Sequence, residues 1–453
     1  MNDFNEQKQI PDQRSVPEAP IESDLPIARS GRGWTIALVA SSAVLVLMAG
    51  FIFGMMAERN VFSGGGIMIA GRHYLANDSS SGDFNDLKEV HKLIEDEYYY
   101  LPEDPAERVA FEKKLEFDAI QGMTSGLEDH YTAFLPPAQQ APVAEQMSGE
   151  YNGIGVWVDF PDGRFRVISP MPGSPAEAAG IKRGDVILKA DGHPLTGIGE
   201  DVALELLRGP AGTTVRLTIQ RPGVEQPLAI DVVRQKITTP AVFYTLLSDS
   251  KTAVIQVTVF GDKTTEQLDD ALKHAREDGA TGIVLDLRNN GGGWVQSAQE
   301  MIGRFVPSEK GVALYEDTDP SDQNLDSEPI LAGKVSEYHL PMVVLVNGGT
   351  ASASEIVAGA LRDYGRAEII GEKSFGKGSV QHVHDFADGS SARITFAQWL
   401  TPAKHIIQGA GLKPDIFVVA QGDNQSNDAQ LNAAVDVLHG RTVPLDGLPA
   451  LWQ

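Results

Sequence analysis

The stretch MVVLVNGGTASASEI, residues 342–356, joins an apolar run to a segment of small residues. The run Met342–Val346 is apolar at every position, which predicts a strand buried on both faces of a sheet. From residue 351 to residue 364 apolar residues recur at helical spacing, which predicts an amphipathic helix. The stretch therefore places a strand-to-helix junction at Ser352.

Similar patterns precede this junction. Residues 253–260 and 282–287 form further apolar strand patterns, and residues 265–277 between them have the spacing of an amphipathic helix. Because strands alternate with helices, we expect an α/β fold with parallel strands joined by crossovers. The acidic, turn-rich residues 316–328 are expected to form a surface excursion between such units.

Ser352 is a candidate nucleophile because of its place at the start of the helix. Free backbone N–H groups and the helix dipole favour negative charge there, so the Ala353 N–H is a natural donor to an oxyanion. The alternative is a helix cap: Ser352 and Ser354 are typical capping residues, and Glu355 follows Ser352 at the spacing of a capping box.

A candidate base lies in the glycine-rich segment GEKSFGKGSVQ, residues 371–381. Lys377 can take a proton from a serine hydroxyl only when it is neutral, and burial favours the neutral amine. Gln381 is placed to hydrogen-bond and orient that amine. The alternatives are a surface lysine and an ordinary strand glutamine.

A third segment, DLRNNGGG at residues 286–293, follows a predicted strand. Its glycines permit close approach of backbone to a substrate, and a strand-end turn explains them equally well. It is not a phosphate-binding loop, because no Gly-Lys-Ser/Thr follows at the required spacing.

Together these segments closely resemble the C-terminal processing peptidases, the tail-specific proteases of the S41 family of serine peptidases. The family's serine-alanine-serine-glutamate motif is intact at residues 352–355, and its Phe-Gly-Lys-Gly turn places Lys377 25 residues after Ser352 (377 − 352). The resemblance implies an α/β catalytic core of the crotonase/ClpP-like type, over residues 237–420. It assigns the nucleophile to Ser352 rather than Ser354, the base to Lys377 and the supporting role to Gln381. It also implies oxyanion donors from Ala353 and from Gly292 or Gly293.

Residues 148–236 alternate short apolar runs with Gly and Pro turns and resemble a PDZ domain of the bacterial protease type, inserted before the core. Backbone N–H groups in a glycine-containing loop can hold a terminal carboxylate, and the peptide adds a strand to the sheet. We expect the partner to be a protein or peptide with a free C-terminus. A tight turn is the alternative for these glycines. The predicted peptide-binding residues are Tyr151, Gly153, Ile154, Gly155 and Val156.

The N-terminal part predicts a membrane anchor. Residues 34–56 carry no charge over 23 positions, long enough at ~1.5 Å per residue to cross a ~30 Å hydrocarbon core. We expect residues 1–33 to be a disordered cytoplasmic tail, residues 57–82 a linker and residues 83–147 a helical region. The charge bias around the span places the catalytic part outside the cytoplasm, in a bacterial cell envelope.

Composition excludes some functions. A formal net charge of −25 argues against nucleic-acid binding, and the absence of cysteine excludes disulfides and thiolate chemistry. His382 and His384 alternate along a predicted strand without a third ligand, so no metal site is expected, and the resemblance implies no cofactor.

These observations predict a membrane-anchored serine endopeptidase that binds C-terminal tails and cleaves with a serine–lysine dyad. One alternative is a non-catalytic PDZ scaffold at the membrane, which would need neither Ser352 nor Lys377. Another is an acyl-CoA enzyme on the related crotonase-like fold, against which the PDZ-like insertion argues. A homo-oligomer is possible, and residues 421–453 are expected to be a tail with one helix, at residues 429–438.

Overall fold

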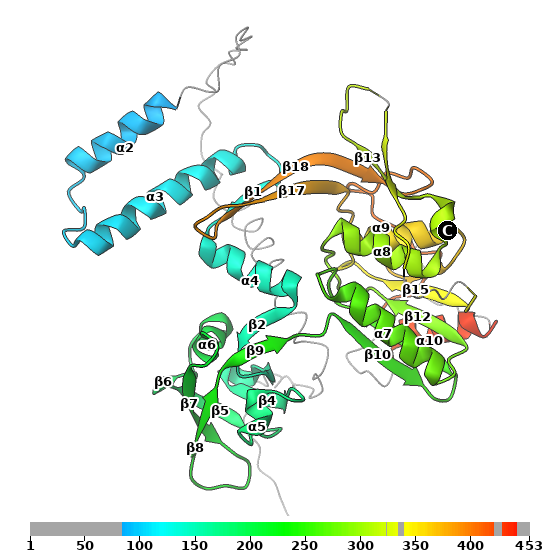
Figure 1. Cartoon of the computed structure of the whole chain (residues 1–453), viewed down its shortest axis with the longest axis horizontal. Coiled ribbons are helices and arrows are strands. Elements are labelled where there is room, and N and C mark those ends of the chain that lie inside the picture. The colour runs from blue at the N-terminus through cyan, green and yellow to red at the C-terminus, as the bar shows by residue number, and fades with distance from the viewer. Residues whose placement is uncertain (1–83, 323, 334–338, 421–427, 442–453) are drawn as a thin grey trace, which may run out of the picture. The chain divides into compact units, whose positions relative to one another are not determined.

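The computed structural model of the chain describes residues 84–322, 324–333, 339–420 and 428–441. Its central sheet has the strand order β10-β11-β12-β15-β16-β19, in which all neighbours are parallel except the antiparallel pair β10–β11 (Figure 1). The parallel order confirms the predicted crossovers. The strands are β10 (Val242–Leu247), β11 (Thr252–Val257), β12 (Gly282–Asp286), β15 (Met342–Val346), β16 (Glu368–Gly371) and β19 (Ile416–Phe417).

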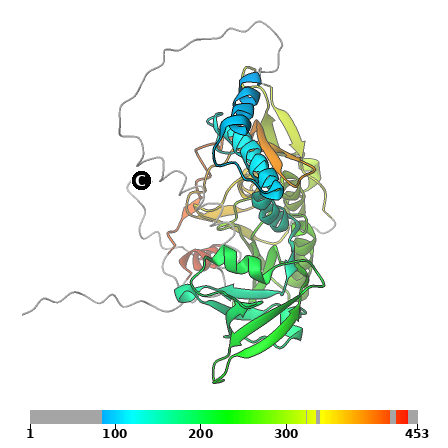
Figure 2. The same ribbon diagram turned by 90° about the vertical axis from the view of Figure 1, so that its left-hand side faces the viewer.

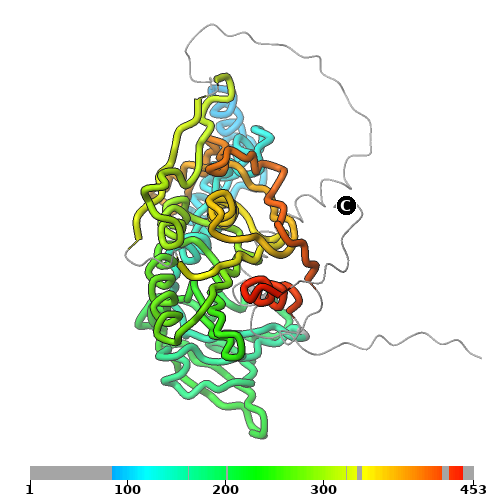
Figure 3. The backbone as a smooth tube through the Cα atoms, turned by 90° about the vertical axis from the view of Figure 1, so that its right-hand side faces the viewer, coloured from blue at the N-terminus to red at the C-terminus, as the bar shows by residue number. Residues whose placement is uncertain are grey.

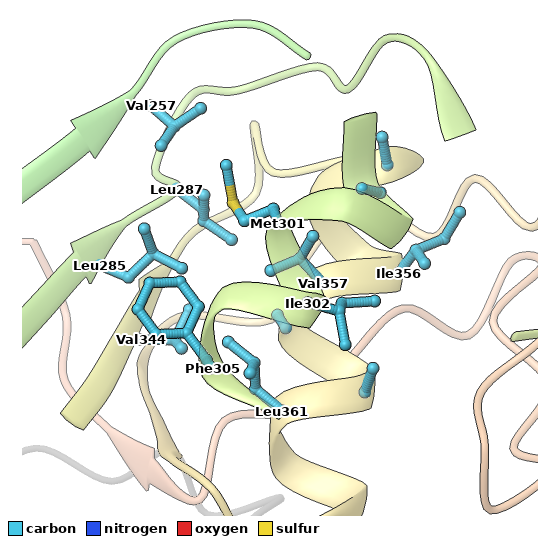
Figure 4. Packing of buried hydrophobic residues seen from close by; sticks show 14 of the residues in the cluster. Val257, Leu285, Leu287, Met301, Ile302, Phe305, Val344, Ile356, Val357 and Leu361 are labelled. Atoms are coloured by element: carbon cyan, nitrogen blue, oxygen red, sulfur yellow. The ribbon is translucent and has the colours of Figure 1, made fainter. Parts of the chain in front are cut away.

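Helices cover both faces of this sheet, which explains the continuous apolar strands. Every residue of β12 and β15 is buried. Ile283 and Leu285 of β12 pack in the cluster with α7 (Thr264–Glu277), α8 and α9, whereas Val284 packs in the cluster with α10. Figure 4 shows the first cluster, and Figure 3 shows α10 in red on the other side. The remaining helices are α8 (Val295–Phe305), α9 (Ala353–Asp363) and α10 (Ala429–Leu438).

A second sheet carries the segment that follows Lys377. Its order is β1-β18-β13-β14, with β17 paired to β18 in an antiparallel hairpin. Within residues 316–328, predicted as an excursion, the end of β13 and the start of β14 pair as a hairpin, because Tyr315 and Glu316 register with Ser327 and Asp326. The strands are β1 (Ala133–Leu135), β13 (Val312–Asp317), β14 (Asp326–Pro329), β17 (Ser379–Asp385) and β18 (Ser391–Leu400).

The N-terminal helical region reaches this sheet through β1. Phe134 of β1 contacts Phe117 of α3 and Phe386 of the β17–β18 turn, with ring centroids 5.5 and 6.2 Å away. Figure 2 shows the helical region, in blue and cyan, beside the orange strands of this sheet. Lys113 also pairs with Asp388 of that turn at 3.0 Å. The helices are α2 (Asn85–Glu97), α3 (Pro105–Ser125) and α4 (Pro137–Ser148).

Residues 150–238 form a β-rich unit with its own core. Phe165, Ile187, Leu217 and Ile219 are buried together between the sheet and its short helices. The sheet order is β3-β4-β5-β7-β8, with β6 paired to β5, and β2 pairs with β9 as a separate ribbon. The elements are β2 (Glu150–Gly153), β3 (Val156–Asp159), η1 (Pro161–Gly163), β4 (Phe165–Pro170), α5 (Pro175–Ala178), β5 (Val186–Ala190), β6 (His193–Pro194), α6 (Glu200–Leu207), β7 (Thr214–Gln220), β8 (Leu228–Val233) and β9 (Gln235–Thr238).

The predicted tail, membrane span and linker, residues 1–33, 34–56 and 57–82, lie outside the described residues. Within the described ranges, no helix combines the length and the apolar character needed to cross a bilayer.

Candidate functional site

Ser352 stands one residue before α9, in an uncommon backbone conformation. Its φ is 55° and its ψ is −120°, a region that residues with a Cβ rarely adopt. The loop leading to it is tied to the strand-end loop of β12, because Thr350 Oγ1 donates to the Leu287 carbonyl at 2.9 Å and the Ala351 N–H donates to the Asn290 carbonyl at 3.0 Å. These two hydrogen bonds hold the loop in place, which allows the strained conformation of Ser352 to persist.

The buried carboxylate of Glu355 joins the serine segment to the lysine segment. Its Oε2 accepts the N–H groups of Ser352 at 2.8 Å and of Lys377 at 2.9 Å. Its Oε1 accepts from the Ser374 hydroxyl at 2.5 Å and the Gly376 N–H at 2.7 Å. Glu355 is fully buried. One carboxylate therefore fixes the two segments relative to each other.

Four donors satisfy this carboxylate, which burial would otherwise make costly. Burial raises the pKa of Glu355, while the hydrogen bonds from Ser374, Ser352, Gly376 and Lys377 limit the rise. The capping interpretation accounted for only one of these four bonds. Sequence reasoning missed the other three, because the sequence predicted an amphipathic helix, whereas the first nine residues of α9 are all buried and a glutamate among them must be satisfied.

Ser354, the other serine of the motif, is engaged elsewhere. It is fully buried, and its hydroxyl donates to the Asn290 carbonyl at 2.9 Å. A hydroxyl that already donates inside the core is poorly placed to attack a substrate. This separates it from Ser352, which is only partly buried.

The glycine run after β12 lies directly against Ser352. A Cβ on Gly292 would stand 2.7 Å from Ser352 Cβ and 2.9 Å from the Ala353 nitrogen, so only glycine fits. The Gly292 N–H donates to Asn290 Oδ1 at 2.9 Å. For the N–H groups of Gly293 and Ala353, no hydrogen-bond acceptor is found among the described residues.

The backbone of Lys377 is held on both sides. Its N–H is bound by Glu355, and its carbonyl accepts from the Trp399 indole at 3.0 Å. The flanking Gly378 has no room for a side chain, since a Cβ there would lie 2.4 Å from the Gln408 nitrogen. Position 378 therefore requires glycine, and the Lys377 side chain extends from a backbone that is held rigidly.

The Lys377 amine has the electrostatics that the base requires. Burial lowers the pKa of Lys377 to about 8, the positive charge of Arg393 adds to the lowering, and Asp129 and Glu355 oppose it. A larger share of neutral amine is thus present near neutral pH than in a solvated lysine. The Nζ atom lies 5.0 Å from the centroid of the Tyr131 ring.

The structure does not place the Gln381 amide on the Lys377 amine. Gln381 Nε2 donates to the hydroxyls of Ser379 at 2.9 Å and Thr395 at 3.1 Å, because Gln381 and Thr395 are register partners in β17 and β18. Nor does a hydrogen bond join Ser352 Oγ to Lys377 Nζ in the part of the chain described here. Glu355 brings the two segments together at their backbones.

The predicted peptide-binding residues divide between two strands and a short link. Tyr151 and Gly153 lie in β2, in register with Ile237 and Gln235 of β9, and Val156 begins β3. Only Ile154 and Gly155 form the link. Gly155 has a φ of 74° and packs against Ser174, where a Cβ would lie 2.5 Å from Ser174 Cβ. The loop is therefore shorter than the sequence predicted.

Comparisons with known proteins identify the family of this chain. A family model described as peptidase family S41 matches residues 251–418, and a PDZ-domain model matches residues 166–221. The carboxy-terminal processing protease CtpA of Bacillus subtilis is 36% identical over 341 residues, 75% of this chain and 70% of that protein. A probable CtpA-like serine protease of Staphylococcus aureus is 37% identical over 345 residues, 76% of this chain and 66% of that protein. The structure of the photosystem II D1 C-terminal processing protease aligns with a TM-score of 0.42 at 30% identity, over 79% of this chain and 91% of that one.

Proposed function

The chain belongs to peptidase family S41 and, within it, to the C-terminal processing proteases, and on that premise we propose that it cleaves proteins near their C-termini with a Ser352–Lys377 dyad. The observation that carries the dyad is the Glu355 carboxylate, which accepts N–H groups from both residues. A scaffold that only bound peptides would need no such link. The lowered pKa of Lys377 supports its role as a neutral base.

In the proposed reaction, the Ser352 hydroxyl gives its proton to the neutral Lys377 amine as Oγ bonds to the scissile carbonyl carbon. The C–N bond then breaks, and the Lys377 ammonium returns the proton to the leaving amine. A water molecule attacks the acyl-enzyme while Lys377 accepts its proton. The second tetrahedral intermediate collapses as the C–Oγ bond breaks, the Lys377 ammonium returns its proton to Ser352 Oγ, and the acid is freed.

The oxyanion would be held by the Ala353 N–H and one N–H of the glycine run. Because the Gly292 N–H already donates to Asn290, we assign the second donor to Gly293. The Ala353 nitrogen stands at the first turn of α9, where the helix leaves N–H groups without partners. Gln381 would serve as the third member of the site through its Oε1, which can accept from the Lys377 amine while Nε2 donates to Ser379 and Thr395.

Substrate selection would fall to the PDZ domain. We propose that it binds an extended, free C-terminal tail beside the link of Ile154 and Gly155, whose N–H groups can receive a carboxylate. The proposed domains are residues 83–147 for the helical region, 148–236 for the PDZ domain and 237–420 for the catalytic domain. Residues 34–56 would anchor the chain in a bacterial membrane, with the catalytic part outside the cytoplasm.

Cleavage of an unfolded reporter with an apolar C-terminal tail tests the function. The full chain in detergent, Ser352→Ala and Lys377→Ala would be compared, with a reporter whose terminal carboxylate is amidated alongside. We expect cleavage by the parent alone, reduced on the amidated reporter. Equal cleavage by a folded Lys377→Ala protein would contradict the dyad, and tail binding without cleavage by any form would favour the scaffold.

A further inference from the structure

A tyrosine from the N-terminal region lies over the proposed catalytic lysine. Tyr131 belongs to the segment DHYTAFL, residues 129–135, to which the proposed reaction gives no task. Its ring centroid is 5.0 Å from Lys377 Nζ, although the two residues are 246 positions apart in the chain (377 − 131). Both side chains are partly buried.

The backbone around Tyr131 is built to hold this position. Asp129 accepts the Tyr131 N–H at 3.0 Å and the Thr132 hydroxyl at 2.7 Å. Thr132 Oγ1 in turn accepts the Thr395 N–H of β18 at 2.9 Å, and Ala133 of β1 registers with Arg393 of the same strand. The segment is thus fastened to the hairpin that begins just after Lys377.

Three charged groups face the lysine from the elements packed around it. Arg393 comes from β18, Asp129 from the turn before β1, and Glu355 from α9. Arg393 Nε is buried without a hydrogen-bond partner in the described residues, and Asp385 is the carboxylate that interacts with this guanidinium. Arg393 repels a charged Lys377, whereas Asp129 and Glu355 attract one.

We propose that Tyr131 is a positioning residue for Lys377: its ring covers the amine and keeps bulk water from it, so that Lys377 remains a competent base. The proposal rests on the proposed role of Lys377. An ammonium loses solvation under such a cover, which disfavours the charged form. The attraction between the ring face and a cation would by itself favour the charged form of Lys377. The sign of the change on removing the ring therefore identifies which effect dominates.

The test uses three variants of the full chain, Tyr131→Phe, Tyr131→Leu and Tyr131→Ala. The pKa of Lys377 would be measured by its rate of acetylation with trace acetic anhydride at pH 6–11, followed by mass spectrometry. The acid limb of the pH profile of kcat/KM on the tail reporter would be recorded in parallel. Tyr99→Ala, which removes a tyrosine that is 88% exposed on the same N-terminal region, is the matched control.

We expect the parent and the Phe and Leu variants to titrate alike, near pH 8. Tyr131→Ala should titrate at higher pH, and its kcat/KM at pH 7 should fall by about tenfold for each unit of that rise. An unchanged or acid-shifted titration of a folded Tyr131→Ala protein would overturn the proposal, and so would a Leu variant that behaves like Ala. Labelling requires no turnover, so repeating it in Ser352→Ala separates failure of this inference from failure of the peptidase assignment.

Discussion

The two halves of the proposed site are built on different kinds of structure. Ser352 stands between β15 and α9, where all of β15 and residues 353–361 are buried. Lys377 precedes β17, a strand whose last four residues are exposed, and its surroundings come from α9, Trp399 of β18 and the distant Tyr131. The core fixes the proposed nucleophile, whereas separate segments must meet to place the proposed base.

Substitutions in the two halves should have different effects. A change on the serine side disturbs the core and with it the fold, because buried residues are closely packed. A change on the lysine side alters proton transfer at a smaller cost in stability. Substitutions on the serine side should therefore lower both activity and stability, whereas substitutions on the lysine side should lower activity more than stability.

The largest effect on activity is expected from Lys377→Met. A general base contributes about 10²–10⁴-fold to a rate, so kcat/KM should fall by ~10²–10⁴-fold. Removing a buried amine that is costly to charge should at the same time raise the Tm, by ~2–4 °C if the gain is ~1 kcal/mol. Peptide cleavage and calorimetry at pH 7 measure both. Lys373→Met, at an exposed lysine of the same turn, should change neither, and a Tm that fell in Lys377→Met would contradict the comparison.

Glu355→Gln should reduce both activity and stability. The amide keeps one acceptor but turns a donor toward N–H groups, so some of the four bonds to this side chain must break. We expect kcat/KM to fall by ~10²-fold and the Tm by several degrees, as for a disrupted buried network. Glu277→Gln on α7, where the side chain is 58% exposed, is the control. Loss of activity with an unchanged Tm would show that Glu355 does not join the two halves structurally.

Gly292→Ala tests the serine side alone. The new Cβ would lie 2.7 Å from Ser352 Cβ, and the φ of 103° is strained for alanine. We expect kcat/KM to fall by ~10–10²-fold and stability by ~1–3 kcal/mol, measured by urea unfolding. Gly279→Ala also has a positive φ, 70°, but no atom within 4 Å, so it reports strain without the clash. Equal effects of the two variants would remove the packing explanation.

The smallest effect is expected from Thr132→Val on the lysine side. The change keeps the shape but leaves the Thr395 N–H without its acceptor, at a cost of ~1–3 kcal/mol. Because the turn that carries Tyr131 loosens, kcat/KM should fall severalfold while the structure of the core persists. Thr281→Val, at an exposed position, serves for comparison. A full loss of activity would mean that the lysine side is as rigidly coupled as the serine side.

The sequence predicted the serine side better than the lysine side for a physical reason. The strand Met342–Val346 and the helix after Ser352 follow from local sequence patterns. Their predicted boundaries differ from those in the structure by at most two residues. The contact of Tyr131 with Lys377 depends on strand pairing across more than 240 positions, which no local pattern encodes.

Two contacts that the sequence did not predict have the same origin. Gln381 was expected to orient the lysine, and its Nε2 donates to Ser379 and to Thr395, which the register of β17 with β18 brings opposite it. Tyr151 and Gly153 were expected in a loop, yet they pair with β9, about 80 residues later. Turn glycines and polar side chains were visible in the sequence, whereas their partners were set by pairing between distant strands.

The strained backbone at Ser352 lowers the stability of the fold, and the proposed activity requires a serine at this position. At a φ of 55° and a ψ of −120°, glycine is the residue that fits without strain, and any residue with a Cβ loses ~1–3 kcal/mol there. Ser352→Ala keeps that strain, whereas Ser352→Gly would relieve it. An inactive descendant with glycine at this position would therefore be more stable than its active parent. Retention of serine in a lineage would then reflect selection for catalysis acting against selection for stability.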